Sequence, residues 1–129
     1  MTEETDGKAE RISDAEQAVM EALWEESPLT AAEVCDRVSA ARDWSMPTVK
    51  TLLGRLVGKG AVETEPDGRR FLYSPTIERA EFVDRESRRL VDRLFGGRAA
   101  PLIAHLAESE ALSDEDLAEI EALLKELRR

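Results

Sequence analysis

The sequence is first notable for what it lacks. It has a single cysteine, which cannot form an internal disulfide, and a single histidine, where a metal site needs several ligands. No apolar run approaches the roughly 20 residues of a membrane span. The first ten residues lack the basic-then-apolar order of a signal peptide. These absences argue against a disulfide-stabilised secreted fold and against membrane insertion, and they predict a cytoplasmic protein.

Catalytic motifs are missing as well. The chain contains no glycine-rich phosphate loop, no HExxH motif and no nucleophile elbow. No base is plausibly paired with Cys35, which we expect to be a buried apolar side chain rather than a redox centre. The lone His105 fits a surface or dimer-face histidine. The sequence therefore predicts no enzyme, no cofactor and no metal site.

Charge is abundant but unevenly distributed. Charged residues make up 36% of the chain and the formal net charge is -10, which at first argues against a nucleic-acid partner. Between Arg42 and Ser74, however, the sequence contains six basic and four acidic residues. This stretch is the candidate for contact with an anionic partner.

The stretch from Ser45 to Lys59 predicts an amphipathic helix. Its apolar residues recur at three- and four-residue spacing and share one face: Val49, Leu52, Leu53, Leu56 and Val57. Its other face carries hydroxyl and basic groups: Thr48, Lys50, Thr51 and Arg55. Such groups suit the base edges and phosphates of a DNA major groove. An ordinary solvated surface helix shows the same pattern, so the neighbouring segments must decide.

Two capped helices precede this stretch. Ser13 and Glu16 form a capping box that begins a helix extending to about Glu26. Its apolar stripe is Ala15, Val19, Ala22 and Leu23, and its polar side is acidic (Glu16, Glu21 and Glu25) and should face away from phosphates. Thr30 can cap a second helix over residues 31–41. A short helix joined by a turn to a helix with exposed polar groups is typical of a helix-turn-helix.

A predicted hairpin follows at residues 62–74. Two partly alternating segments flank Asp67-Gly68, a strong hairpin signal. Arg69 and Arg70 lie at or near its tip. A basic hairpin directly after a recognition helix indicates the wing of a winged helix, with both arginines on phosphates or in the minor groove. An ordinary hairpin with solvated arginines is the simpler alternative.

The remainder predicts three helices, from Thr76 to Phe95, from Pro101 to Glu108 and from Ser113 onward. They carry more apolar surface than a small winged domain can cover, which favours burial against a second copy. Packing back onto the same chain is the alternative. The residues expected at the dimer interface are Leu90, Leu94, Ile103, Leu106, Leu117, Ile120, Leu124 and Leu127.

Several segments together resemble the penicillinase repressor family of the BlaI/MecI type. They are ISDAEQAVMEALWE, LTAAEV, TVKTLLGRLVGKG, GRRFLYSP, RLFGG and LSDEDLAEIEALL, which span nearly the whole chain. The expected architecture is mainly α with a small β-wing: a disordered leader at 1–11, a winged helix-turn-helix domain at 12–75 and a helical dimerisation region at 76–129. The resemblance implies a homodimeric repressor of β-lactamase or related genes that binds palindromic operator DNA.

The resemblance also assigns roles to residues. It implies that Thr48, Lys50 and Thr51 meet bases and phosphates, that Arg55 meets a phosphate, and that the wing meets the flanking backbone. Relatives are released from DNA when a membrane sensor-protease pathway leads to their cleavage between Asn and Phe.

Two departures from the family pattern are visible. The pair matching the Asn-Phe cleavage position is His105-Leu106. The Cys-x-Cys motifs of copper-responsive members do not occur here. The alternative in another class is a winged-helix protein–protein adaptor without sequence-specific DNA binding, which the acidity favours.

Overall fold

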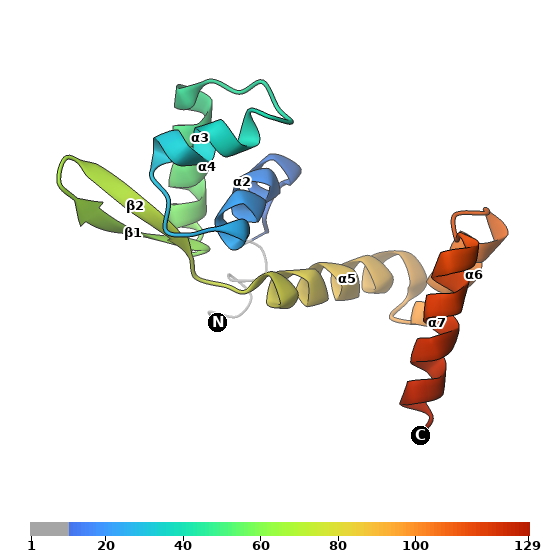
Figure 1. Cartoon of the computed structure of the whole chain (residues 1–129). Helices are drawn as coiled ribbons and strands as arrows, with labels where there is room; N and C mark the ends of the chain where they lie inside the picture. The colour runs from blue at the N-terminus through green and yellow to red at the C-terminus, as the bar shows by residue number, and fades with distance from the viewer. Residues whose placement is uncertain (1–10) are drawn as a thin grey trace, which may run out of the picture. The chain divides into compact units, whose positions relative to one another are not determined.

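The computed structural model describes residues 11–129, so the predicted disordered leader lies outside the described residues except for Arg11. The elements follow one another as α2 (Asp14–Glu25), α3 (Ala31–Val38), α4 (Met46–Gly58), β1 (Val62–Asp67), β2 (Arg70–Pro75), α5 (Arg79–Phe95), α6 (Ala99–Glu108) and α7 (Asp114–Leu127). The described chain divides into two compact units, one ending at Phe82 and the other formed by Val83–Arg129. The predicted mainly α class with a small β-wing is confirmed (Figure 1).

The first unit is built on three helices that begin at well-defined caps. Ser13 and Glu16 form the predicted capping box, in which each side chain accepts a hydrogen bond from the other residue's amide. Thr30 and Glu33 form a second box at the start of α3. These exchanges satisfy amide donors that have no partner inside a helix, so both starts could be predicted from local sequence.

The core of this unit lies where α2, α3 and α4 meet. Its buried side chains come from the apolar faces of all three helices, from two connecting segments and from the first residue of β1: Val19, Met20, Ala22, Leu23, Leu29, Val34, Val38, Val49, Leu52, Leu53, Leu56, Ala61 and Val62. The predicted apolar faces of α2 and α4 are therefore confirmed, with one exception. Val57 is 38% exposed, because the side of α4 that faces the core is occupied by Val49, Leu52, Leu53 and Leu56.

The wing is an antiparallel hairpin of β1 and β2. Asp67 pairs with Arg70, so the turn consists of Gly68 and Arg69, one residue later than Asp67-Gly68. Gly68 has a φ of 68°, a left-handed conformation that glycine adopts at low cost. Leu29 adds a bridge to Tyr73 on β2 and thereby ties the wing to the loop before α3. Figure 1 shows the hairpin projecting from the three helices.

The start of α5 packs onto α2 within the first unit. Trp24 Nε1 donates a hydrogen bond of 2.8 Å to the carbonyl of Ile77, and the Trp24 ring lies 5.3 Å from the Phe82 ring, centroid to centroid. Arg79 Nε lies 2.9 Å from a carboxylate oxygen of Glu21. The chain after the wing is therefore held against the back of the helical cluster.

Three details differ from the sequence prediction. α3 ends at Val38 rather than near Ala41, and the residues from Ser39 to Ala41 form a turn instead. Thr76 does not cap α5, because its hydroxyl donates to the carbonyl of Gly60 and the helix begins at Arg79. Glu16 does not belong to a solvated acidic face, because it is buried at the α2–α4 contact.

The second unit has almost no interior of its own. Neither α6 nor α7, both of which are fully described, contains a buried side chain. Ser113 and Asp116 form a capping box that starts α7, with three acidic residues in its first turn. The positive end of the helix dipole favours those acids. No helix within residues 11–129 combines the length and the apolar character needed to cross a bilayer.

Candidate nucleic-acid interface

The polar face of α4 is displayed to solvent. Ser45 caps the helix by accepting a hydrogen bond from the Thr48 amide, and Pro47 lies in the first turn, where a missing N–H costs nothing. The four predicted contact residues of this helix are all exposed: Thr48, Lys50, Thr51 and Arg55. The opposite face is anchored in the core, so α4 presents these side chains on a rigid element.

The wing adds two further cations. Arg69 and Arg70 are exposed, and Arg70 Nε lies 3.2 Å from Asp67 Oδ2. Such an exposed pair contributes about 0–1 kcal/mol, so it does not prevent Arg70 from engaging another anion. Lys50 of α4 and both arginines line one groove between the helix and the wing. The structure thus brings three of the six predicted DNA-contact residues together, while Thr48, Thr51 and Arg55 lie outside this groove.

Lys59, the last cation of the α4 segment, has a different position. Its Nζ lies 2.6 Å from Glu16 Oε1 and 2.6 Å from the Arg11 carbonyl. Burial alone would raise the pKa of Glu16, but the hydrogen bonds from Lys59 and the Ser13 amide outweigh it and lower that pKa. Lys59 therefore fastens the end of α4 to the start of α2 and is not part of the exposed cationic face.

Sequence reasoning missed Phe71 as a candidate contact residue. This ring is 51% exposed and lines the same groove as Lys50 and Arg69. Strand alternation gives only part of the signal. It places Phe71 and Tyr73 on one strand face and Leu72 on the other, but it does not show which ring is exposed. An isolated leucine on a surface is common and indicates nothing about function, whereas an exposed aromatic ring beside cations is a candidate contact for a ligand.

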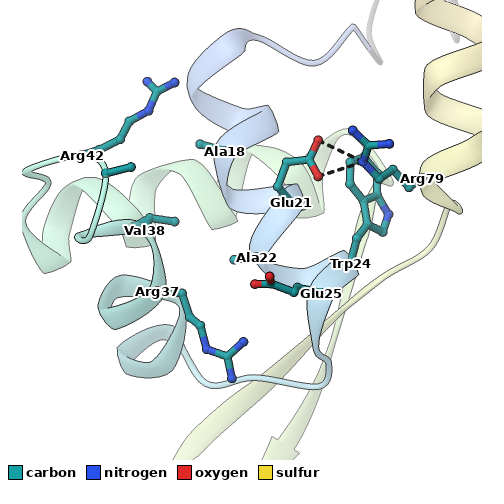
Figure 2. Close-up of a pocket in the computed structure, with 10 residues that line it drawn as sticks. Ala18, Glu21, Ala22, Trp24, Glu25, Arg37, Val38, Arg42 and Arg79 are labelled. Atoms are coloured by element: carbon teal, nitrogen blue, oxygen red, sulfur yellow. Dashed lines mark hydrogen bonds and ion pairs between the residues drawn. The ribbon is translucent and has the colours of Figure 1, made fainter. Parts of the chain in front are cut away.

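Another cavity lies beside α2. It has a volume of about 550 Å³ and is lined by Glu21, Trp24, Arg37, Arg42 and Arg79, among others. Figure 2 shows that its arginines do not converge: Arg42 and Arg37 point in different directions, and Arg79 is bound to Glu21. The hydrogen bond from Arg79 lowers the pKa of Glu21 and keeps this carboxylate ionised. A ligand site usually offers convergent polar groups, and this cavity does not.

The other singled-out residues have ordinary surroundings. Cys35 is half-buried, with its Sγ 3.9 Å from the Trp44 carbonyl oxygen. His105 is exposed on α6. Within residues 11–129, no group of three or more His, Cys, Asp or Glu side chains is arranged to hold a metal ion.

A capped helix cluster, an exposed basic face on its third helix and a basic hairpin after it define a winged-helix protein of the nucleic-acid-binding class. Residues 12–126 match the family model described as the penicillinase repressor. The penicillinase repressor of Bacillus licheniformis is 33% identical over 119 residues, covering 92% of this chain and 93% of that protein. The chain belongs to the penicillinase repressor family, whose members are DNA-binding transcriptional repressors.

Two solved structures resemble the first unit. The solution structure of the DNA-binding domain of the repressor BlaI is 39% identical, with a TM-score of 0.52, and covers 57% of this chain and 90% of that one. Monomeric BlaI of Bacillus licheniformis in complex with the blaP half-operator gives 39% identity and a TM-score of 0.50 over the same shares of the two chains. In that second structure the relative is bound to DNA.

Proposed function

We propose that this protein is a homodimeric repressor that binds palindromic operator DNA and controls β-lactamase or related antibiotic-response genes in the cytoplasm. Residues 12–75 would read each half-site and residues 76–129 would hold the two copies together. The half-operator complex of BlaI supports the DNA partner, since it shows a relative with 39% identity bound to half of its operator. No catalytic role follows from membership of a repressor family.

One observation carries the dimer. The helices α6 and α7 bury none of their own side chains, although apolar residues recur along them. Leu117, Leu124 and Leu127 are 48%, 47% and 79% exposed. Water contact on this many large apolar groups is unfavourable by about 25 cal/mol per Å². A second copy would remove that contact through a two-fold interface, and two-fold symmetry would match a palindromic operator.

The DNA contacts follow from the two exposed elements. We place α4 in the major groove, where Thr48, Lys50 and Thr51 reach bases and phosphates and Arg55 reaches a phosphate. The wing, through Arg69 and Arg70, would meet the flanking backbone. A dimer would make twice the DNA contacts of one protomer, and this larger number of contacts would compensate for the modest positive charge of each copy.

The test of DNA binding is a titration of labelled duplexes with the full-length protein, followed by fluorescence anisotropy. Fragments of the source genome selected by the protein supply the candidate operator. Operator affinity should fall steeply as salt rises, because binding releases counterions from DNA. Lys50→Ala should weaken operator binding by about 1–3 kcal/mol if Lys50 reads a base, and equally on every sequence if it holds a phosphate. Absence of sequence-preferring binding at low salt would refute the repressor.

The test of dimerisation is sedimentation of Leu124→Asp. An aspartate at this position would be desolvated in the interface, so the variant should be monomeric. Ala122→Asp is the matched control, because Ala122 lies on the opposite side of α7 by the 3.6-residue helical repeat and is also exposed. An unchanged dimer in Leu124→Asp would remove Leu124 from the interface.

We also propose that a protease-linked signal releases the repressor, by cleavage at or near His105-Leu106. Family membership supports this proposal, together with the shallow packing of α6, where a local opening costs little. Intact-mass measurement of the protein from β-lactam-treated cells should show two fragments whose masses place the cut near residue 105. An intact chain under full derepression would refute this route.

The competing function is a protein–protein adaptor built on the same winged helix. The net charge of -10 favours it, since an acidic chain repels DNA at long range. The anisotropy titration separates the two functions, because an adaptor has no reason to prefer one duplex sequence over another.

A further inference from the structure

The groove between α4 and the wing combines cationic and apolar walls. Its volume is about 520 Å³, and all three of the surrounding elements contribute to it. Lys50 comes from α4, Arg69 and Phe71 come from the wing, and Ala31 and Ala32 come from the start of α3. A groove that offers both charge and an exposed aromatic ring suits a ligand that is itself both anionic and apolar.

The start of α3 adds backbone donors to this groove. The capping box already uses the amides of Thr30 and Glu33. The amides of Ala31 and Ala32 have no acceptor among residues 11–129, as expected for the first turn of a helix. They are consistent with an anion in the groove, although the cations and the ring carry the argument.

The ring of Phe71 is the unexplained element. It is 51% exposed, while Tyr73, on the same strand face, is half-buried and packs against the core. Phe71 does not belong to the buried core, and about half of its surface remains in contact with water. Two carboxylates lie near its neighbour Arg70: Asp67 by an ion pair, and Glu33, whose pKa Arg70 helps to lower after the larger effect of the Thr30 hydrogen bonds. Arg70 thus has two carboxylates near it, while Lys50 and Arg69 are the other cations that line the groove.

We propose that one sugar-phosphate strand of duplex DNA lies in this groove, with Phe71 packed on a deoxyribose and Lys50 and Arg69 on the phosphates beside it. The inference rests on the proposed DNA-binding function and adds Phe71 to its contact residues. The geometry of duplex DNA supports the proposal. If α4 lies in the major groove and the wing lies at the adjacent minor groove, the DNA backbone that separates the two grooves must pass between α4 and the wing. The deoxyribose has apolar C–H faces, and its phosphates supply the negative charge that the cations match.

The test compares full-length variants by anisotropy on the selected operator and on an unrelated duplex. Phe71→Ala removes the ring, Phe71→Tyr keeps it, and Leu72→Ala truncates the neighbouring side chain on the other face of the wing. Phe71→Ala should weaken binding roughly 10- to 50-fold, as expected for about half an aromatic ring leaving a contact. The loss should be equal on both duplexes, because a sugar contact carries no sequence information. Phe71→Tyr and Leu72→Ala should bind within about threefold of the parent.

Salt dependence distinguishes the ring from the cations. The slope of log affinity against log salt should be unchanged in Phe71→Ala and smaller by about 1 in Arg69→Ala. Hydroxyl-radical footprinting should show that Phe71→Ala loses protection of the sugars between the two grooves. Circular dichroism checks that each variant is folded.

The outcomes separate the two proposals. A parent protein that binds no duplex refutes the proposed function. A parent that binds while Phe71→Ala binds equally well refutes the groove contact alone. An equal loss in Leu72→Ala also refutes it, since the ring would then act only by supporting the hairpin. A loss on the operator but not on the unrelated duplex would move Phe71 to a base edge and overturn the sugar contact.

Discussion

Lys59 gives the sharpest test of how the recognition helix is held. Its ammonium group lies 2.6 Å from a carboxylate oxygen of Glu16, whose side chain is only 3% exposed, while that of Lys59 is 25% exposed. Lys59→Met would leave the Glu16 carboxylate buried without its main counter-charge. Loss of one partner of a buried pair costs about 3–5 kcal/mol, and the partial exposure of Lys59 favours the lower limit of about 3 kcal/mol. For a domain of this size the midpoint of thermal unfolding should fall by roughly 10–20 °C.

The assay is urea unfolding at fixed protein concentration, followed by tryptophan fluorescence. Glu16→Gln combined with Lys59→Met should recover much of the loss, because the uncompensated charge is then absent while the amide oxygen can still cap α2. A loss below about 1 kcal/mol in Lys59→Met would refute the reasoning, since that is the value of an exposed pair.

The pH dependence supplies an independent check. The pKa of Glu16 is lowered in the folded protein, so its contribution to stability is present above the ordinary glutamate pKa and is lost as pH falls through the lowered value. The parent and Lys59→Met should therefore approach each other in stability below about pH 4. If the difference in unfolding free energy between the parent and Lys59→Met stayed constant down to lower pH, the destabilisation would come from lost packing rather than from the lost charge pair. At temperatures where both are folded, the salt slope of DNA binding should be the same, because Lys59 lies away from the exposed face of α4.

Three further predictions concern other parts of the chain. Phe82→Ala should destabilise the first unit by about 3 kcal/mol, since the ring is 95% buried against Trp24, and should shift the tryptophan emission to longer wavelength; an unchanged spectrum would contradict the contact. Ser113→Ala should cost about 1 kcal/mol by removing the cap of α7, with Ser109→Ala as control, measured as a lower helix content and a weaker dimer. Glu63→Gln with Glu65→Gln should raise operator affinity severalfold at about 0.01 M salt and little at about 0.15 M, because the Debye length shrinks from roughly 30 Å to roughly 8 Å; an equal gain at both concentrations would indicate direct contact with DNA.

Local sequence was sufficient to predict the starts of α2, α3 and α7. The pairs Ser13–Glu16 and Ser113–Asp116 are three residues apart, and each box closes within its own turn. The apolar face of α4 followed equally from its spacing. Such features depend on residues that are neighbours in sequence, so no knowledge of the fold was needed.

Features that depend on distant partners could not be predicted in the same way. Glu16 was expected on a solvated face because its partner, Lys59, lies 43 residues later in the chain. The same applies to Thr76, whose hydroxyl reaches the carbonyl of Gly60 across the base of the wing. For Glu16 a tertiary ion pair adds to the local capping hydrogen bond, whereas for Thr76 a tertiary hydrogen bond replaces the expected local role.

The candidate site divides along the same line. The exposure of the four α4 residues could be predicted from periodicity, and that of the two wing arginines from their position beside Gly68. Phe71 could not be recognised as an exposed residue, since an aromatic residue in a strand is as often part of the core. The folded structure shows which ring remains available, because Phe71 is 51% exposed while Tyr73 packs against the core.

The acidity of the chain is compatible with an anionic partner once charge is considered locally. Exposed charges separated by more than about 8 Å are largely screened at physiological salt, so the sum of -10 has little influence on a contact made by one face. The basic groups that meet DNA in the proposed complex come from α4 and the wing tip, whereas Glu63 and Glu65 lie on the wing face opposite Phe71. Lys59 is engaged by Glu16, so the recognition helix presents fewer cations than its sequence contains. Each protomer would then bind DNA weakly and depend on apolar contact at Phe71 and on a second copy for affinity. In the proposed complex, breaking the dimer would release the repressor without any change in the residues that contact DNA.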